Sequence, residues 1–248
     1  MTADPLAPLV ELAGVADGVA ATRAAVDSLL VNRVLRRRSG DVSAESSLRG
    51  AWAAAWLSGR EHPLDAVRSS TVGADPVLQG ALRAYSAIPA LADTWTRAPR
   101  QVLARLHALA AADLVADSGR LGRPVEQPGV AARLDTLAGV LGGTSAPAVV
   151  VAAVVHGELL SLDAFAPVSG ILALVAVRLT LIERGLDPKS LVVVEAGHRV
   201  MSREYALALD AYRTGTPDGI GRWIAHCADA VVAGARESSA ICEAMARG

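Results

Sequence analysis

Cysteine, lysine and phenylalanine are almost absent from this chain of 248 residues. It contains two cysteines, Cys227 and Cys242, and single copies of the other two, Lys189 and Phe165. The cysteines lie in a segment with helical periodicity, where a rise of about 1.5 Å per residue places them roughly 22 Å apart. A disulfide needs Cα atoms within about 7 Å, so this pair is excluded within the chain. We therefore expect free thiols and a reduced compartment.

Excess charge and long apolar runs are also lacking. The chain has 24 Lys+Arg against 25 Asp+Glu, a balance that gives no support to nucleic-acid binding through bulk charge. The N-terminal residues show no signal peptide, and the longest apolar run, Ala146 to Val155, is well short of the about 20 residues that span a bilayer. With 52% hydrophobic residues, the chain can still build a full core. We expect a cytoplasmic protein without nucleic-acid or membrane partners.

Strand-type clusters are scarce as well, and most segments between Gly, Pro and Ser/Asp breakers have helical periodicity. The sequence therefore predicts an all-α fold in a single domain, residues 1–248. The one β-like run, Leu191 to Val194, is either a strand stub or a buried turn. Helices are predicted over 17–38, 43–58, 63–70, 76–90, 95–117, 129–141, 146–161, 169–185, 200–213 and 217–246.

Two of these helices, 146–161 and 169–185, are apolar on nearly every face. A helix of this kind must be surrounded by others, so both are predicted to form the centre of the bundle, with loop 162–168 opening from it. The last helix has a single apolar stripe and is predicted to pack on the outside. This stripe consists of Ile220, Trp223, Ile224, Cys227 and Val231.

The loop between the two central helices resembles the motif of the Fic (Fido) family, His-Pro-Phe-x-Asp/Glu-Gly-Asn-Gly-Arg-x-x-Arg, with Phe165 at the phenylalanine. Members are α-helical proteins that transfer AMP or related phosphoryl groups to protein hydroxyls. The likeness extends to His156 upstream and to Leu106-His-Ala with Ser118-Gly-Arg-Leu-Gly-Arg-Pro124, which is similar to a Gly-Lys/Arg-x-Arg element of the family. It implies a Fic-like helical bundle with N-terminal helices at 1–60, a core at 61–215 and an outer helix at 216–248.

The resemblance also implies that the catalytic parts of the motif are missing. Asp163 stands at the histidine that deprotonates the target hydroxyl, Pro167 at the metal-binding acid, and Ile171 and Leu174 at the two arginines. Only Phe165 and Gly170 are kept. The other positions are filled by Ala164 for proline and by Val168 and Ser169 for the first Gly and the Asn.

These losses bear directly on phosphoryl transfer, which depends on positive groups that neutralise the phosphates. Without the Mg²⁺ ligand and both arginines, only the N-terminal amides of helix 169–185 remain as an anion site. The carboxylate of Asp163 repels a triphosphate and is a poor base at neutral pH unless it is buried. We therefore expect no catalytic residue, no metal and no cofactor.

Two regulatory parts are altered too. The segment Trp52 to Gly59 resembles the inhibitory helix of many Fic proteins, Ser/Thr-x-x-x-Glu-Gly/Asn, with Ala54 at the hydroxyl position, Ser58 at the glutamate and Gly59 kept. That glutamate pairs with the second motif arginine, so both ends of the ion pair are lost together. The flap that adds target peptides as a strand is reduced to Pro124–Gly129, whose two prolines leave little backbone for pairing.

The histidines are not spaced in the sequence as metal ligands usually are. His156 lies in an apolar helix and is interpreted as a hydrogen-bonded core residue, with a substitute base as the alternative. His107 and His198 are isolated, apart from Glu195 near His198, so no metal site is predicted. Arg36 to Arg38 fits a solvated helix end or an anionic partner patch.

Two functions remain. The first is a pseudoenzyme that lacks AMP-transferase activity and acts through protein contacts, with an unknown partner or as a homo-oligomer, using the outer helices and Trp52, Trp56 or Trp95. The second is a protein nucleotidyl transferase that uses a non-standard Fic pocket for a nucleotide or phosphate ligand. Val168, Ile171 and Leu174 favour the first, because their side chains would fill the old pocket.

Overall fold

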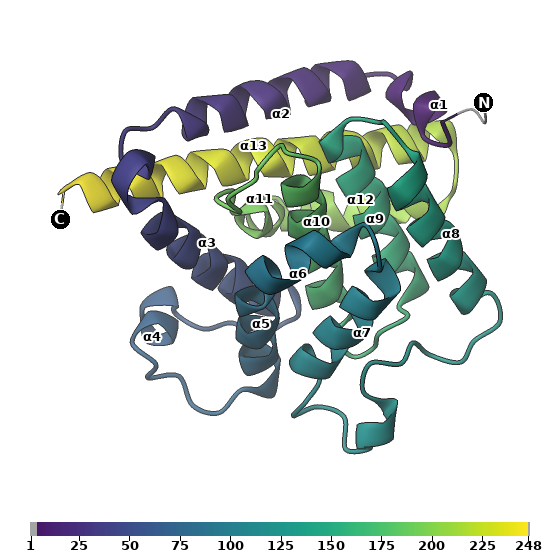
Figure 1. The fold of residues 1–248 in the computed structure, drawn as a ribbon, viewed down its shortest axis with the longest axis horizontal. Helices are drawn as coiled ribbons and strands as arrows, with labels where there is room; N and C mark the ends of the chain where they lie inside the picture. The colour runs from purple at the N-terminus through teal and green to yellow at the C-terminus, as the bar shows by residue number, and fades with distance from the viewer. Residues whose placement is uncertain (1–3, 248) are drawn as a thin grey trace.

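The computed structural model describes residues 4–247, which form helices and connections without a strand (Figure 1). This confirms the predicted all-α class. The elements are α1 (Ala7–Val10), α2 (Val15–Leu30), α3 (Leu35–Leu57), α4 (Leu64–Arg68), α5 (Pro76–Ser86), α6 (Ile88–Trp95), α7 (Pro99–Ala110), the 3₁₀ turn η1 (Ser118–Arg120), α8 (Val130–Gly143), α9 (Ala148–Leu162), α10 (Ser169–Glu183), α11 (Val194–Val200), α12 (Ser202–Arg213) and α13 (Pro217–Arg247).

Helices α9 and α10 are the centre of the bundle, as their all-round apolar character predicts. They pack against each other, and α10 also contacts α3, α5, α6 and α7. Most residues of α9 and nearly all of α10 are buried. Although both are strongly apolar, no helix within residues 4–247 has the length and apolarity that a bilayer crossing requires.

Helix α13 corrects the expectation of an outer C-terminal helix at 216–248. Its apolar stripe does face inward, and Trp223, Ile224, Cys227 and Val231 are buried. However, α2 lies along the other side of α13, so the long helix is enclosed between α2 and the pair α11 and α12 (Figure 1). The outer layer is α2, which buries one face only.

The N-terminal helix boundaries also differ from the prediction. The predicted helix 17–38 breaks after Leu30, where the Asn32 side chain accepts the Val34 amide at 3.0 Å and forms a local turn. Helix α3 then continues through residues 39–42, where the sequence predicts a break between two helices, with only a kink at Arg38. The Arg38 guanidinium donates to the Met245 carbonyl of α13 at 2.7 Å, which ties this kink to the neighbouring helix.

Prolines explain a second difference. The predicted helix 95–117 is divided, because Pro99 begins α7 and α7 ends at Ala110. Proline has no amide hydrogen and suits the first turn of a helix, so it starts a new helix here. Likewise, the predicted helix 76–90 ends at Ser86 and is followed by α6, with Pro89 in its first turn.

The β-like run is a buried turn, one of the two predicted alternatives. The Asp187 carboxylate accepts the amides of Leu191 and Val192 at 2.9 and 2.8 Å. Because these amides are bonded to a side chain, they do not enter a ladder, and α11 begins at Val194.

Candidate functional site

The motif loop, Asp163–Val168, joins the two central helices. Asp163 ends α9 in the left-handed conformation, with φ of 44°, and its side chain is exposed. Phe165 is 4% exposed and points into the core, while its amide donates to the Ser169 hydroxyl at 3.0 Å. These contacts fix the loop against the start of α10.

A surface cavity of about 1000 Å³ lies beside the exposed part of this loop. Ala166 and Pro167 form one wall, and the segment 114–126, with Arg120 and Arg123, forms another. Both arginines are exposed, and neither forms an ion pair within residues 4–247. The motif loop therefore borders a hollow large enough for a small ligand.

His107 lies at the base of this cavity. Its Nδ1 accepts the Gly122 amide at 3.0 Å, and its ring centroid is 5.6 Å from that of Phe165. Burial lowers the pKa of His107, so the ring is neutral and carries its proton on Nε2. The geometry gives His107 a structural role in holding the Gly122 turn.

Ile171 and Leu174, which the motif resemblance assigns to the two arginines, lie elsewhere. Ile171 is 1% exposed and Leu174 2%, and neither lines the cavity. Val168 and Ser169 are also buried, and Gly170 is half-buried. The apolar replacements are therefore core residues of α10.

The inhibitory-helix-like segment is the end of α3. Ala54 is fully buried, and the exposed Ser58 donates its hydroxyl to the Ala54 carbonyl at 2.9 Å. Gly59 has φ of 79°, and the next amide, Arg60, bonds to the Ala55 carbonyl at 2.9 Å. This is the pattern of a glycine helix cap, so Gly59 has a structural reason that is independent of any inhibitory role.

The three tryptophans predicted to make protein contacts are buried or half-buried. Trp95 is 0% exposed and donates to the Thr180 hydroxyl at 3.0 Å, so it is a core residue. Trp52 and Trp56 on α3 are half-buried, and the Arg199 guanidinium lies 4.5 and 5.8 Å from their ring centroids. These three residues, Trp52, Trp56 and Arg199, are named the tryptophan patch.

The flap region forms no hairpin in residues 124–129. One backbone bond joins it to the motif loop, from the Val125 amide to the Ala164 carbonyl at 2.8 Å. The backbone edge of the motif loop at Ala164 is therefore already paired with Val125 of the same chain.

A buried ion pair lies further along α10 and was not predicted. Arg178 and Glu195 are 2% and 0% exposed, and two guanidinium nitrogens donate to the two carboxylate oxygens at 2.7 and 2.8 Å. The Tyr85 hydroxyl donates to Glu195 at 2.8 Å, and Arg178 also donates to Ser46 on α3 at 3.0 Å. The pair therefore connects α3, α5, α10 and α11.

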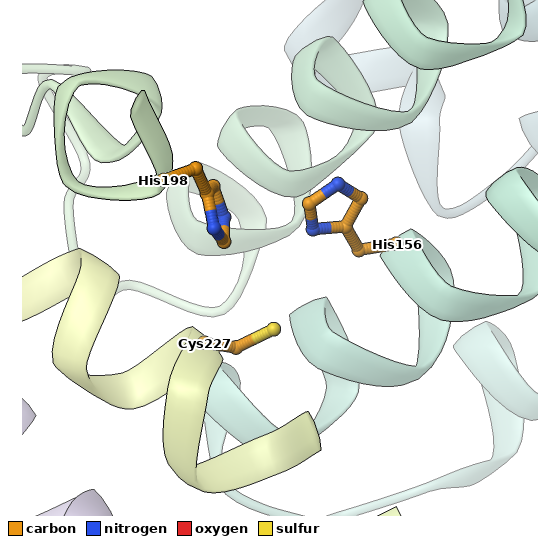
Figure 2. Close-up of side chains that lie close together, drawn as sticks. All are labelled: His156, His198 and Cys227. Carbon is orange, nitrogen blue, oxygen red and sulfur yellow. The ribbon is translucent and has the colours of Figure 1, made fainter. Parts of the chain in front are cut away.

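A second buried group is formed by His156, His198 and Cys227, named the His–Cys cluster (Figure 2). One potential ligand atom from each residue lies within 4.8 Å of the others. The residues come from α9, α11 and α13, so their sequence separation conceals the cluster. The sequence alone therefore gives no reason to associate His156 with His198.

The polar neighbours of the cluster are also buried. His156 Nε2 lies 2.9 Å from the Tyr205 hydroxyl, which confirms His156 as a hydrogen-bonded core histidine, and His198 Nδ1 lies 3.0 Å from His226 Nε2. Burial, and then the positive charge that His226 can carry, lower the pKa of His156 to about 3. Burial also lowers the pKa of His198 and raises the pKa of the Cys227 thiol. At neutral pH all three groups are uncharged.

Comparison with known proteins supports the fold. No family sequence model matches the chain, and no curated protein matches it in sequence. Among solved structures, a Fic family protein from Desulfovibrio desulfuricans G20 is similar, with a TM-score of 0.74 and 18% sequence identity. The match covers 90% of this chain and 74% of that protein. The chain therefore has the Fic fold.

Proposed function

We propose that this chain is a pseudoenzyme with the Fic fold, which acts through protein contacts and does not transfer AMP. The observation that carries the proposal is the burial of Ile171 and Leu174. The motif resemblance assigns these positions to arginines that hold phosphates, but here they are apolar and packed in the core of α10. A nucleotide in the loop cavity would meet no positive group from these positions.

The exposed part of the motif loop supports the same proposal. Asp163 and Pro167 occupy the positions of the base and the metal-binding acid. Proline offers no side-chain oxygen to Mg²⁺, and the carboxylate of Asp163 repels phosphate groups. Since phosphoryl transfer depends on charge neutralisation, a base alone would not restore it.

The direct test is incubation of the full chain with labelled ATP and Mg²⁺, with and without a cell lysate. We expect no label on this protein or on lysate proteins. Asp163→His is expected to remain inactive, because it supplies a base without a nucleotide site. Label that appears with wild type and disappears in Asp163→Ala would contradict the proposal.

The protein-contact part of the proposal rests on the tryptophan patch. Two half-buried indoles beside an arginine are the residue types that most often dominate protein interfaces. A second copy of the chain or another protein would bury the indole of Trp56, whereas Trp52 is already bonded to the His62 carbonyl.

Sedimentation of the full chain at micromolar concentration tests self-association. If two copies use the patch, Trp56→Ala weakens the dimer at least about tenfold, whereas Val31→Ala, at a 75% exposed position on another surface, leaves it unchanged. A wild type that is strictly monomeric contradicts the homo-oligomer and leaves another protein as the partner. A dimer that both variants form equally well contradicts the use of the patch.

A second function, binding of a phosphate-containing ligand, is favoured by one observation. Arg120 and Arg123 face the cavity of about 1000 Å³ without ion-pair partners in the described residues. Arginine recognises phosphate well, so the cavity offers two guanidinium groups that α10 does not, although the carboxylates of Asp117 and Glu126 line it as well.

A thermal-shift screen with ATP, GTP and CDP-choline, with and without Mg²⁺, distinguishes the two functions. A ligand at 100 times its dissociation constant would stabilise the fold by about 2.7 kcal/mol. Stabilisation that Arg123→Gln abolishes and Arg105→Gln keeps would establish the ligand function. Arg105 is exposed on α7 and does not line the cavity, so it is a charge-matched control.

A further inference from the structure

The His–Cys cluster combines three side chains, of two donor types that bind transition metals. An imidazole comes from α9, a second imidazole from α11, and a thiol from α13 (Figure 2). In Figure 2 the Cys227 sulfur points towards the space between the two rings. None of the three residues lines the motif-loop cavity, so the cluster is separate from the site described above.

Two ring nitrogens of the cluster are buried without a partner, His156 Nδ1 and His198 Nε2. The other nitrogen of each ring is engaged, by Tyr205 and by His226. When these engaged nitrogens carry the protons, both free nitrogens present lone pairs. Histidine ligands of metals are commonly oriented in this way, by a hydrogen bond from the opposite ring nitrogen.

A small cavity lies among the same residues. Its volume is about 10 Å³, close to the about 10–15 Å³ that holds one water molecule or ion. Apart from the three cluster residues, its walls are alanine and valine side chains, including Val149, Val194 and Val231. An occupant would therefore meet two imidazoles, one sulfur and no oxygen ligand.

The net charge of the metal ion and its thiolate ligand indicates which metal the cluster would bind. A thiolate with a monovalent cation is neutral, whereas a thiolate with a divalent cation leaves one positive charge in a wall of valines. Uncompensated buried charge is strongly unfavourable. Thiolate ligands also favour Cu⁺, and imidazole suits copper. Zn²⁺ normally takes a fourth ligand, which the cavity walls do not supply.

We propose that the His–Cys cluster binds one Cu⁺ ion through His156, His198 and Cys227. The thiol proton leaves to solvent, a copper–sulfur bond forms, and the oxidation state of copper does not change. Ligand atoms around one metal lie about 3.3–3.7 Å apart, as metal–nitrogen distances of about 2.0 Å and metal–sulfur distances of about 2.3 Å require. From the present limit of 4.8 Å, the side chains approach by about 1 Å on binding.

The test loads the full chain with Cu⁺ under anaerobic, reducing conditions, in competition with the chelator bathocuproine disulfonate, and measures copper per chain after desalting. We expect about one copper in wild type, and at least about 100-fold weaker binding in Cys227→Ser and His156→Gln. The matched controls are Cys242→Ser and His107→Gln. Both control residues are buried, and neither belongs to the cluster, so these variants should keep the copper.

Copper that is absent from wild type, or that depends on Cys242 and not on Cys227, would overturn the proposal and leave a water molecule as the occupant. Zn²⁺ held in preference to Cu⁺ under equal competition would overturn the choice of copper. Circular dichroism checks that each variant is folded. If a cluster variant is unfolded, X-ray absorption of the loaded wild type decides: one sulfur and two nitrogen neighbours support the site, and any other ligand set contradicts it.

Discussion

The two halves of helix α10 bury different kinds of side chain. Near the motif loop, the helix buries Ile171 and Leu174, at positions that the motif resemblance assigns to arginines. One turn further on, it buries Arg178, with a carboxylate, a phenol and serine groups around the guanidinium. The difference shows that this core accepts a charge where partners are built for it. The burial of apolar residues at the loop end therefore does not reflect a general intolerance of α10 for arginine.

The strongest test of this difference places an arginine at the loop end. Leu174→Arg should lower the free energy of unfolding by about 5 kcal/mol or more, because it adds an unpaired buried charge and overpacks the core. Urea unfolding followed by circular dichroism measures the loss. The control, Leu174→Met, conserves volume and should cost less than about 1.5 kcal/mol. A folded Leu174→Arg protein of nearly wild-type stability would mean that the loop end can place the charge in solvent.

Removing the counter-charge of Arg178 should have the next largest effect on the free energy of unfolding. Glu195→Gln leaves Arg178 buried without its counter-charge and should cost about 3 kcal/mol, measured by the same unfolding experiment. Glu237→Gln breaks the ion pair of Glu237 with Arg49, which is partly exposed, and should cost less than about 1 kcal/mol. Equal losses of unfolding free energy in the two variants would show that the buried ion pair contributes no more to stability than the partly exposed one.

The sequence predicted the parts of the fold that depend on one segment at a time. Helical periodicity gave the all-α class, and all-round apolarity placed α9 and α10 at the centre. The break before α3 was missed because it depends on the side chain of Asn32. The position of α13 was wrong because an apolar stripe does not reveal that α2 covers the opposite face. Asn32 acts through a local hydrogen bond, and α2 acts through a contact between distant segments. Neither contact is visible in the hydrophobic periodicity of a single segment.

The candidate sites also differ in whether their residues are contiguous in the sequence. The motif loop could be located from sequence because its residues are contiguous and lie between two recognisable helices. The Arg178–Glu195 pair and the His–Cys cluster could not, because each joins helices that are distant in the chain. The burial of Trp95 was missed for the same reason, since its partner Thr180 comes from α10.

Acid should destabilise the protein through the buried histidines. The folded-state pKa of His156 is lowered to about 3, below its unfolded value of about 6.5, so the unfolded state binds more protons between these values. This contribution to stability is complete above pH 6.5 and is lost as pH falls towards 3, by up to about 1.4 kcal/mol per pH unit for each such histidine. The titratable groups around His156 are His198, His226, Tyr205 and Cys227, and burial lowers the pKa of both other histidines as well.

Unfolding experiments between pH 7.5 and 4.5 measure this slope. His156→Leu should reduce the slope, because one proton-binding group is removed from the unfolded state. A slope that is unchanged in His156→Leu would show that this histidine is not kept neutral by burial.

The smallest effect is expected at the motif loop itself. Asp163 adopts φ of 44°, a conformation that costs most residues about 1–2 kcal/mol and glycine almost nothing. Asp163→Gly should therefore change the free energy of unfolding by less than about 1 kcal/mol, in the stabilising direction, because relief of this strain exceeds the extra entropy of an unfolded glycine. Asp163→Ala keeps the Cβ and should be the less stable of the two variants. Urea unfolding of both proteins measures the order, and a clear loss in Asp163→Gly would show that the carboxylate holds the loop. If substitutions at Asp163 change stability little and Leu174→Arg lowers it strongly, then the packing of α10, and not the exposed loop, limits which residues this segment accepts.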